Sequence, residues 1–493
     1  MSEKFKSIYF QLLSGGIITI LVIIPLFPKL PLFSVSGTFV AVRLEDFIIA
    51  LFGLLALPIL WQRRKELLGN NLVLAILGFW LIGAFSTFSA IFVTQTVSPH
   101  LAALHYLRRI EYLAPFFIVL AAKPDLTKVT NYFKVLIFTS IIVVLYGMGQ
   151  IWLGFPVFST ANTEFAKGIP LTLGPEARVN STFAGHYDLA AYTALMLSIL
   201  GGLLFFTPSG GKISGSAAAL NAASKLIFGL SFGVRQKLVK VLILLTSIAN
   251  FWLLLQTASR ISFISYLVGI TVVLLLLKKR AFLILVLLIS FLALLTSSEL
   301  RNRFFNTFKY GIKTLSYQVV PVAAQALPVR ATQTATIAAT PKPYDDVVPG
   351  EPTDTQQLGV FRSSRVRFDF EWPAAARAFL RNPLMGSGYS NLGLATDNDY
   401  LRSLGEVGIF GTAAFALIFL EIGKRIWGFL KKVDELNFQK TVVIGFSGMI
   451  AALLVNATFI DVFEASKIAI LFWTLIGILI TIIKLAYENS KSN

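Results

Sequence analysis

Cysteine is absent from the 493-residue chain, and histidine occurs only three times. The chain can therefore form no disulfide, no thiolate zinc site and no cysteine nucleophile, and three histidines argue against a histidine cluster around a metal. Charged residues are also scarce, since Asp, Glu, Lys and Arg make up 14% of the chain, against about 25% in soluble domains. This scarcity excludes an ordinary soluble protein, and we expect neither a metal nor another cofactor.

Acidic residues are the rarer of the two signs: 25 Asp and Glu stand against 43 Lys and Arg, which gives a formal net charge of +18. In a soluble protein this excess would suggest a nucleic-acid partner. Here much of the excess flanks apolar blocks, where Lys and Arg orient a protein in the bilayer. We therefore expect a lipid bilayer, and no nucleic acid, around this chain.

Apolar sequence is what the chain has in quantity, with 56% hydrophobic residues. These residues fall in blocks of about 20, the length that an α-helix needs to cross ~30 Å of hydrocarbon. The predicted fold class is all-α, a polytopic membrane protein with about twelve transmembrane helices. No small-residue cleavage site follows the first apolar run, so we count that run as a span and not as a signal peptide. The predicted spans cover residues 7–28, 44–61, 72–92, 103–122, 133–153, 187–206, 239–256, 261–277, 281–297, 405–423, 441–460 and 468–485.

Lys and Arg are unevenly distributed over the loops. With the N-terminus inside, the inner segments hold 23 Lys and Arg and the short outer segments hold 8, as the positive-inside rule requires. Both termini are therefore expected in the cytoplasm. We expect membrane helices in residues 1–297, an extracytoplasmic loop in 298–404, and membrane helices with a cytoplasmic tail in 405–493. The segments predicted to face out are 31–43, 154–186, 257–260, 298–404 and 461–467.

The long outer loop divides into parts of different composition. Residues 314–360 are rich in Ala, Thr, Pro and Val without periodicity, which predicts a flexible excursion. In residues 361–382 large apolar side chains are mixed with Arg and Asp, which is typical of an amphipathic helix on a membrane surface. A glycine-rich turn then leads into the stretch from Thr396 to Leu401, so residues 361–404 hold both the helix and a turn that carries candidate site residues.

Arginines stand close to apolar spans in three places. Arg178 lies in the polar run ARVNSTFAGHYDLAAY, and Arg260 lies in TASR, the only polar break in an apolar block too long for one crossing. A tight hairpin must therefore place Arg260 at a membrane surface. Arg365 and Arg367 lie in the segment of the amphipathic helix. Contact with lipid headgroups would explain each arginine singly, but a guanidinium is also the natural ligand of a phosphate or diphosphate.

Candidates for proton transfer stand in the same polar stretches: Asp397, Asp399, His186 and Asp188. A lone histidine is more often structural than catalytic, so His186 carries less weight than the aspartates. We predict that the stretches around Arg178, Arg260 and Asp397 meet on one face of the membrane and form one anion-handling site.

Taken in order, these motifs resemble the O-antigen ligase and O-antigen polymerase superfamily of bacterial membrane glycosyltransferases. The resemblance rests on ARVNSTFAGHYDLAAY, on TASR at a hairpin, and on RVRFDFEWPAAARAFLRNPLMGSGYSNLG followed by DNDYLRSLGEVGIFG. It implies transfer of a glycan, with inversion, from a polyprenyl diphosphate carrier to a hydroxyl of a glycan, lipid or protein acceptor. The reaction would take place at the outer face of the bacterial cytoplasmic membrane without a metal. Arg178 and Arg260 match the arginines that hold the diphosphate in this family.

One position departs from the family pattern. The family has His before the Asn of a His-Asn-x-x-Leu element, and here Asp397 precedes Asn398. A carboxylate with a reference pKa of ~3.9 is a weaker base than His unless burial raises its pKa. The base is therefore Asp397 or His186, or the protein has another activity. We assign Asp397, Arg260 and Arg178 as catalytic, and as substrate contacts His186, Asn398, Tyr400, Arg365 and Arg367.

A transporter is the alternative, because twelve spans with both ends inside also suit a carrier of a polysaccharide precursor or of a small anion such as bicarbonate. A carrier should have ionisable residues or broken helices near the middle of its spans. The charges singled out here gather instead at the outer ends of spans, which favours chemistry at one surface. A scaffold for an envelope assembly would not require an arginine in an apolar hairpin. Ligase and polymerase share a donor, so these residues do not separate them.

Overall fold

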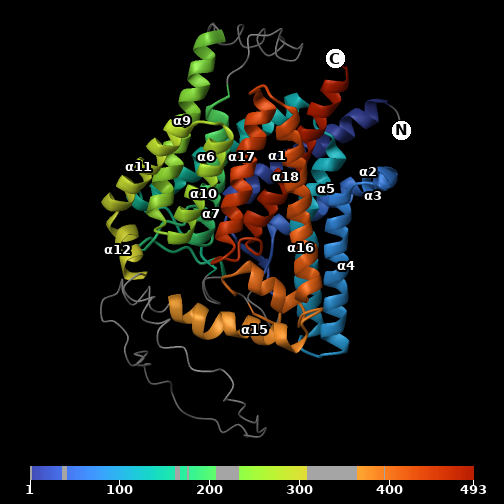
Figure 1. Cartoon of the computed structure of the whole chain (residues 1–493). Helices are drawn as coiled ribbons and strands as arrows, with labels where there is room; N and C mark the ends of the chain where they lie inside the picture. Colours follow the sequence, from blue (N-terminus) through green and yellow to red (C-terminus); the bar gives the residue numbers. More distant parts are fainter. Residues whose placement is uncertain are drawn as a thin grey trace.

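The apolar blocks form α-helices that pack side by side into one bundle, shown in Figure 1. The computed structural model describes residues 3–35, 41–160, 167–174, 177–206, 232–307, 363–393 and 395–492. Helices dominate because a chain in hydrocarbon must satisfy its backbone hydrogen bonds within itself. The helices are α1 (Glu3–Leu26), α2 (Leu44–Gln62), α3 (Arg64–Leu68), α4 (Asn71–Phe92), α5 (Pro99–Ala122), α6 (Leu126–Trp152), α7 (His186–Leu204), α9 (Phe232–Gln256), α10 (Arg260–Leu276), α11 (Arg280–Thr296), α12 (Ser298–Asn306), η4 (Val366–Glu371), α15 (Trp372–Arg381), α16 (Asp399–Lys432), α17 (Phe438–Asn456) and α18 (Ser466–Ser492). Two short strands, β1 (Pro31–Phe33) and β2 (Val42–Arg43), pair antiparallel.

Nine of the described helices are long and apolar enough to cross a membrane. α11 and α12 meet at a bend of 89° and together make a tenth candidate, while α10 is a shorter apolar helix. α5 is not among the nine, and it carries Arg108, Arg109 and Glu111. The protein is therefore an all-helical polytopic membrane protein, as predicted. The count of twelve crossings stays a prediction.

The packing of the inner helices determines at which end of the bundle their first residues lie. Most residues of α7 and α18 are buried. α17 packs against both α7 and α10, and glycines let these backbones approach closely. A Cβ on Gly448 would lie 2.5 Å from the backbone oxygen of Gly269. This packing places the first residues of α7 and α10, His186 and Arg260, at the same end of the bundle.

α15 lies across that end of the bundle, below the other helices in Figure 1. We call it the α15 end. The first turns of α1 and the last turns of α18 lie at the opposite end. Two segments predicted to face out meet at the α15 end, since the Nζ of Lys467 donates a hydrogen bond to the carbonyl of Thr182 over 2.7 Å. The predicted orientation therefore places the α15 end outside the cytoplasm.

The predicted outer loop 298–404 stays a prediction, but it is helical at both ends. Its first residues form α12, and α16 begins at Asp399 and not at 405. The earlier start follows from Asn398, whose side-chain oxygen accepts the backbone N–H groups of Tyr400 and Leu401 at 3.1 and 2.9 Å. This is an N-cap, which stabilises a helix that hydropathy alone does not indicate. The flexible excursion predicted for 314–360 lies outside the described residues.

α16 is broken at Gly408, where φ is 65° and ψ is −166°. Only glycine adopts this conformation without strain, and a Cβ there would lie 2.5 Å from the carbonyl carbon of Leu384. We expect Gly408→Ala to lower the free energy of unfolding by about 3 kcal/mol. Thermal unfolding in detergent measures this change. Gly423→Ala is the control, because its Cβ would meet nothing within 4 Å, and equal melting temperatures for the two variants would contradict the expectation.

An open groove of about 1300 Å³ lies between α2, α4 and α5. Its walls are almost entirely apolar, with Asp46, Arg108 and Glu111 as polar groups along one part and Arg64 near the other end of α2. Surface of this kind faces lipid chains in a membrane protein. The helices that line the groove do not include those that carry Arg178 and Arg260, so the groove is separate from the site described next.

Candidate active site

Arginines from four separate segments converge at the α15 end: before α7, at the start of α10, on α12 and on η4. Arg260 is within electrostatic range of the other three, and its Nη1 donates to the backbone carbonyl of Arg303 at 3.4 Å. Arg178 is likewise within range of Arg303. Four positive charges that interact with one another form a strongly electropositive region. We name it the arginine cluster: Arg178, Arg260, Arg303 and Arg367.

Arg260 owes its position to the hairpin between α9 and α10. The turn passes through Ala258, whose φ is 48°, and Ser259 precedes the first turn of α10. The hydroxyl of Thr257 donates to the carbonyl of Leu254 at 2.6 Å, so the buried turn satisfies its own polar groups. The Nη1 of Arg260 also donates to the hydroxyl of Thr307. The predicted tight hairpin is therefore present, and its guanidinium turns toward α12.

Arg178 is joined to the start of α7 and to α12. Its Nη1 lies 2.9 Å from the Nε2 of His186, and its Nε lies 3.8 Å from a carboxylate oxygen of Glu299. Because a guanidinium has no lone pair to offer, the Nε2 of His186 must accept this hydrogen bond. Burial and the charge of Arg303 lower the pKa of Arg178. The lone pair that would make His186 a base is thus already used by Arg178.

Arg303 and Arg367 are the most buried members of the cluster, with 3% and 7% of their surface exposed. The Nε and Nη1 of Arg303 and the Nε of Arg367 are buried without a hydrogen-bond partner among the described residues. Leaving buried charged donors unpaired is costly. The arginines of the cluster meet two carboxylates within ion-pair distance in the described part of the chain, those of Glu299 and Asp397. Among the described residues, the four arginines of the cluster therefore outnumber the acids that pair with them.

Arg367 is held by an acid and an aromatic residue. Its Nη2 lies 2.6 Å from the Oδ2 of Asp397, and its guanidinium carbon lies 6.0 Å from the centre of the Tyr187 ring. Burial opposes the charge on Arg367, but Asp397 and the Tyr187 hydroxyl outweigh burial and raise the pKa of Arg367. Burial in turn raises the pKa of Asp397 even beside this arginine. The pair therefore links the arginine cluster to the turn that carries Asp397.

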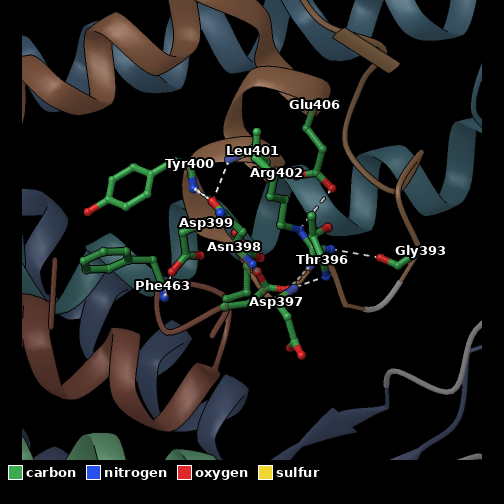
Figure 2. Close-up of polar contacts among 12 residues, drawn as sticks. Gly393, Thr396, Asp397, Asn398, Asp399, Tyr400, Leu401, Arg402, Glu406 and Phe463 are labelled. Carbon is green, nitrogen blue, oxygen red and sulfur yellow. Dashed lines mark hydrogen bonds and ion pairs between the residues drawn. The ribbon is translucent and has the colours of Figure 1, made fainter. Parts of the chain in front are cut away.

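The turn around Asp397 is wrapped around a second carboxylate, that of Asp461. Backbone N–H groups of Thr396, Asp397 and Asn398 donate to Asp461 at 2.7, 3.1 and 2.9 Å. Asp397 itself has a φ of 49°, a conformation that non-glycine residues rarely adopt. In Figure 2 its side chain points away from the Arg402–Glu406 pair. The carboxylate of Asp461 thus holds the turn, and the side chain of Asp397 is left to face Arg367.

Buried ion pairs support this turn from the bundle side. The Nη1 of Arg402 lies 2.9 Å from Asp461, and its Nε lies 3.4 Å from Glu406. Glu406 in turn lies 3.1 Å from Arg109 on α5. Charges that are buried in a membrane protein pair with one another because isolated ones are too costly. The network ties α5 and α16 to the segment between α17 and α18, and so fixes the turn in space.

The other residues predicted for the site have partners within the protein. Asn398 caps α16 and donates to the carbonyl of Thr458 at 3.1 Å. The Tyr400 hydroxyl donates to the carbonyl of Leu454 at 2.7 Å, and Arg365 pairs with Asp369 at 2.9 Å. Asp399 accepts the N–H of Phe463 at 3.2 Å. Substrate contacts of Asn398, Tyr400 and Arg365 stay predictions, as does proton transfer by Asp399, and in the structure these residues hold the loop and helix in place.

Sequence reasoning missed several residues of the site. Arg303 stands in a stretch, SELRNRFF, that was read as part of the outer loop, although its apolar spacing is that of a helix. Asp461 was seen only as part of an outer segment, with no sign of its backbone partners. Glu371 lies near Asp397 and Asp461. Burial, followed by the charges of these two aspartates, raises the pKa of Glu371 to about 7.

Among the described residues, no group of three or more His, Asp or Glu side chains is arranged to hold a metal ion. What the arrangement can do is bind a polyanion on guanidinium groups, with carboxyl groups on the adjacent wall. No known protein-family model matches the chain, and no curated protein matches it significantly.

Proposed function

We propose that the protein is a membrane glycosyltransferase that binds a polyprenyl diphosphate-linked glycan on the arginine cluster. The carrying observation is that four guanidinium groups, two of them almost fully buried with unpaired N–H groups, meet at one end of a membrane helix bundle. A planar guanidinium binds phosphate oxygens through two parallel hydrogen bonds and keeps its charge when buried. The ligand is a lipid diphosphate because the cluster lies at the ends of helices that suit a bilayer.

The positions of the arginines and carboxylates suggest how the glycan would be transferred. The bond between the anomeric carbon of the glycan and the carrier oxygen breaks, and its electron pair leaves with the diphosphate. An acceptor hydroxyl forms the new bond on the opposite face of that carbon and gives up its proton to a carboxylate. Negative charge on the diphosphate grows as the bond breaks, so the fixed arginines stabilise the transition state more than the ground state. The resemblance to O-antigen ligases and polymerases supports the same donor and an outer-face location.

Asp397 takes part through Arg367. In the structure its carboxylate is paired with that arginine at 2.6 Å, so an arriving diphosphate competes with Asp397 for the guanidinium. Asp397 is the base that the sequence suggests, and its raised pKa suits that role. The glycosyltransferase proposal itself needs only that a carboxylate stands beside the cluster, and Asp397 and Glu371 both do.

A transporter remains the alternative. The arginine cluster and its unpaired guanidinium nitrogens lie at the α15 end, which supports chemistry at one surface rather than a path through the bundle. Detergent separates the two, because transport has no meaning without a membrane. Consumption of a polyprenyl diphosphate glycan by purified protein, with transfer to an acceptor, supports the enzyme.

Arg260→Ala tests the function. We expect glycan transfer by the purified variant to fall roughly 10²–10³-fold, because one transition-state donor is lost, while the protein stays monodisperse in detergent. Arg280→Ala is the matched control, since Arg280 begins α11 as Arg260 begins α10, but lies exposed at the other end of α10. Wild-type protein that leaves the donor intact, or an Arg260→Ala variant that transfers at the wild-type rate, would contradict the proposal.

A further inference from the structure

Two of the charged side chains of the π-helix η4, Arg367 and Glu371, have opposite signs and stand one turn apart. Arg367 reaches the arginine cluster, and Glu371 ends η4 beside the first residue of α15. π-helical turns are rare and often occur at functional sites, because the extra residue redirects side chains. The charged groups that act on Glu371 come from the turn before α16, from the connection between α17 and α18, from η4 itself and from α16: Asp397, Asp461, Arg367 and Arg402. Glu371 therefore lies beside the turn that carries Asp397.

Two polar atoms on consecutive residues here lack hydrogen-bond partners among the described residues. The Oε2 of Glu371 and the indole Nε1 of Trp372 are both buried, and neither has a hydrogen-bond partner among the described residues. One atom accepts hydrogen bonds and the other donates them. Buried polar groups are normally satisfied, so an acceptor and a donor on consecutive residues, both left unpaired, point to a ligand with hydroxyl groups.

Two aromatic rings lie beside Trp372. The Trp372 ring lies 4.7 Å from that of Phe368 and 5.6 Å from that of Phe459. Phe459 is partly exposed, so the aromatic group is accessible from outside. Faces of aromatic rings next to a hydrogen-bonding pair offer both an apolar surface and directed polar contacts. This combination suits a sugar, which has C–H faces and hydroxyl edges.

We propose that Glu371 and Trp372 form the acceptor subsite, where Glu371 takes the proton of the attacking carbohydrate hydroxyl. The inference rests on the glycosyltransferase function proposed above and adds the acceptor class and the base. The hydroxyl oxygen bonds to the anomeric carbon, its proton passes to the Oε2 of Glu371, and the electron pair of the breaking bond leaves with the diphosphate. Trp372 Nε1 donates a hydrogen bond to a second oxygen of the same sugar and orients it.

Asp397 is the competing base, and the contacts of the two carboxyl groups separate their roles. Asp397 is bound to Arg367 at 2.6 Å, whereas the Oε2 of Glu371 is unpaired. Two neighbouring acids push their proton affinities apart, so that one stays ionised and the other titrates close to neutrality. Burial and the charges of Asp397 and Asp461 raise the pKa of Glu371 to about 7, the range in which a general base works best.

Glu371→Gln tests the assignment through two measurements on purified full-length protein. We expect glycan transfer to fall roughly 10²–10⁴-fold, while binding of a polyprenyl diphosphate probe stays unchanged. In the wild type, transfer should decrease about tenfold per pH unit below about pH 7, because protonated Glu371 cannot accept a proton. That acidic limb should vanish in Glu371→Gln and persist in Glu371→Asp. Glu435→Gln, an exposed carboxyl after α16, serves as control.

The two proposals fail in different ways. If Arg260→Ala loses transfer but Glu371→Gln keeps the wild-type rate or the acidic limb, the acceptor assignment is overturned and the function stands. If both variants transfer normally, the function falls as well. Should Glu371→Gln not fold, Trp372→Phe decides: it keeps the ring and removes the N–H, so the KM for the acceptor should rise about fivefold. An unchanged acceptor KM in Trp372→Phe overturns the subsite.

Discussion

Arg303→Met should abolish most glycan transfer, with a rate roughly 10³-fold below that of the wild type. Arg303 is 3% exposed, and its Nε and Nη1 are unpaired. It lies within range of Arg178 and Arg260, so its charge acts on whatever anion the cluster binds. Methionine keeps much of the apolar stem and removes only the charged head. Transfer of a labelled glycan by the purified variant measures the effect.

The melting temperature of Arg303→Met should not fall, although its transfer rate does. Removing one of four like charges relieves repulsion within the cluster, so Arg303→Met should melt at the wild-type temperature or above it, as happens when a strained site is relieved. A polyprenyl diphosphate probe should raise the melting temperature of the wild type more than that of the variant, because binding stabilises the folded state in proportion to affinity. Arg301→Met is the control on the same helix, since its guanidinium bonds the carbonyl of Leu295 and stands outside the cluster. Transfer by Arg303→Met within twofold of the wild type would exclude the residue from the site.

Asp461→Asn should remove both stability and transfer. The carboxylate accepts three backbone N–H groups of the turn and pairs with Arg402. An amide keeps one acceptor oxygen and no charge, so Arg402 loses an acid with which it pairs while it remains 3% exposed. Breaking a buried ion pair costs about 3–5 kcal/mol. We therefore expect a clearly lower melting temperature and transfer below detection, as Asp397 loses its position.

Asp434→Asn is the matched control, because this aspartate lies exposed in the connection after α16. An Asp461→Asn variant with a wild-type melting temperature would show that the three backbone contacts do not hold the turn. A variant that melts early but transfers normally would show that the turn is not part of the site. Either result would remove the structural argument for Asp397.

Buried acids and arginines alternate along one chain of ion pairs at this end of the bundle, because an isolated buried charge is too costly. Arg109, Glu406, Arg402 and Asp461 form a chain of buried pairs with distances of 3.1, 3.4 and 2.9 Å. Each charge there is stabilised by its neighbours. The arginine cluster has fewer acids beside it, since in the described part of the chain only Glu299 and Asp397 lie within ion-pair distance of its four arginines.

The sequence by itself determined the class of protein and the helices that make it. Blocks of about 20 apolar residues can satisfy their backbone only as helices in a bilayer, which is a local requirement that needs no knowledge of neighbours. The same local reasoning located Arg260, because a polar break in an overlong apolar block must be a hairpin at a surface. Arg178 and Asp397 stood out for the same reason, as polar groups beside apolar spans.

Only the tertiary structure decided which of these residues act together and with what partners. Asp461 bonds the backbone of a turn more than 60 positions away, and Arg109 meets an acid 297 positions along the chain. Such pairings depend on how helices pack, and neither hydropathy nor residue spacing encodes them. The burial of Arg303, the start of α16 at Asp399 and the free oxygen of Glu371 likewise follow from packing. The distances between charged groups are set by how the helices pack. The partners of each site residue could therefore be identified only from the folded chain.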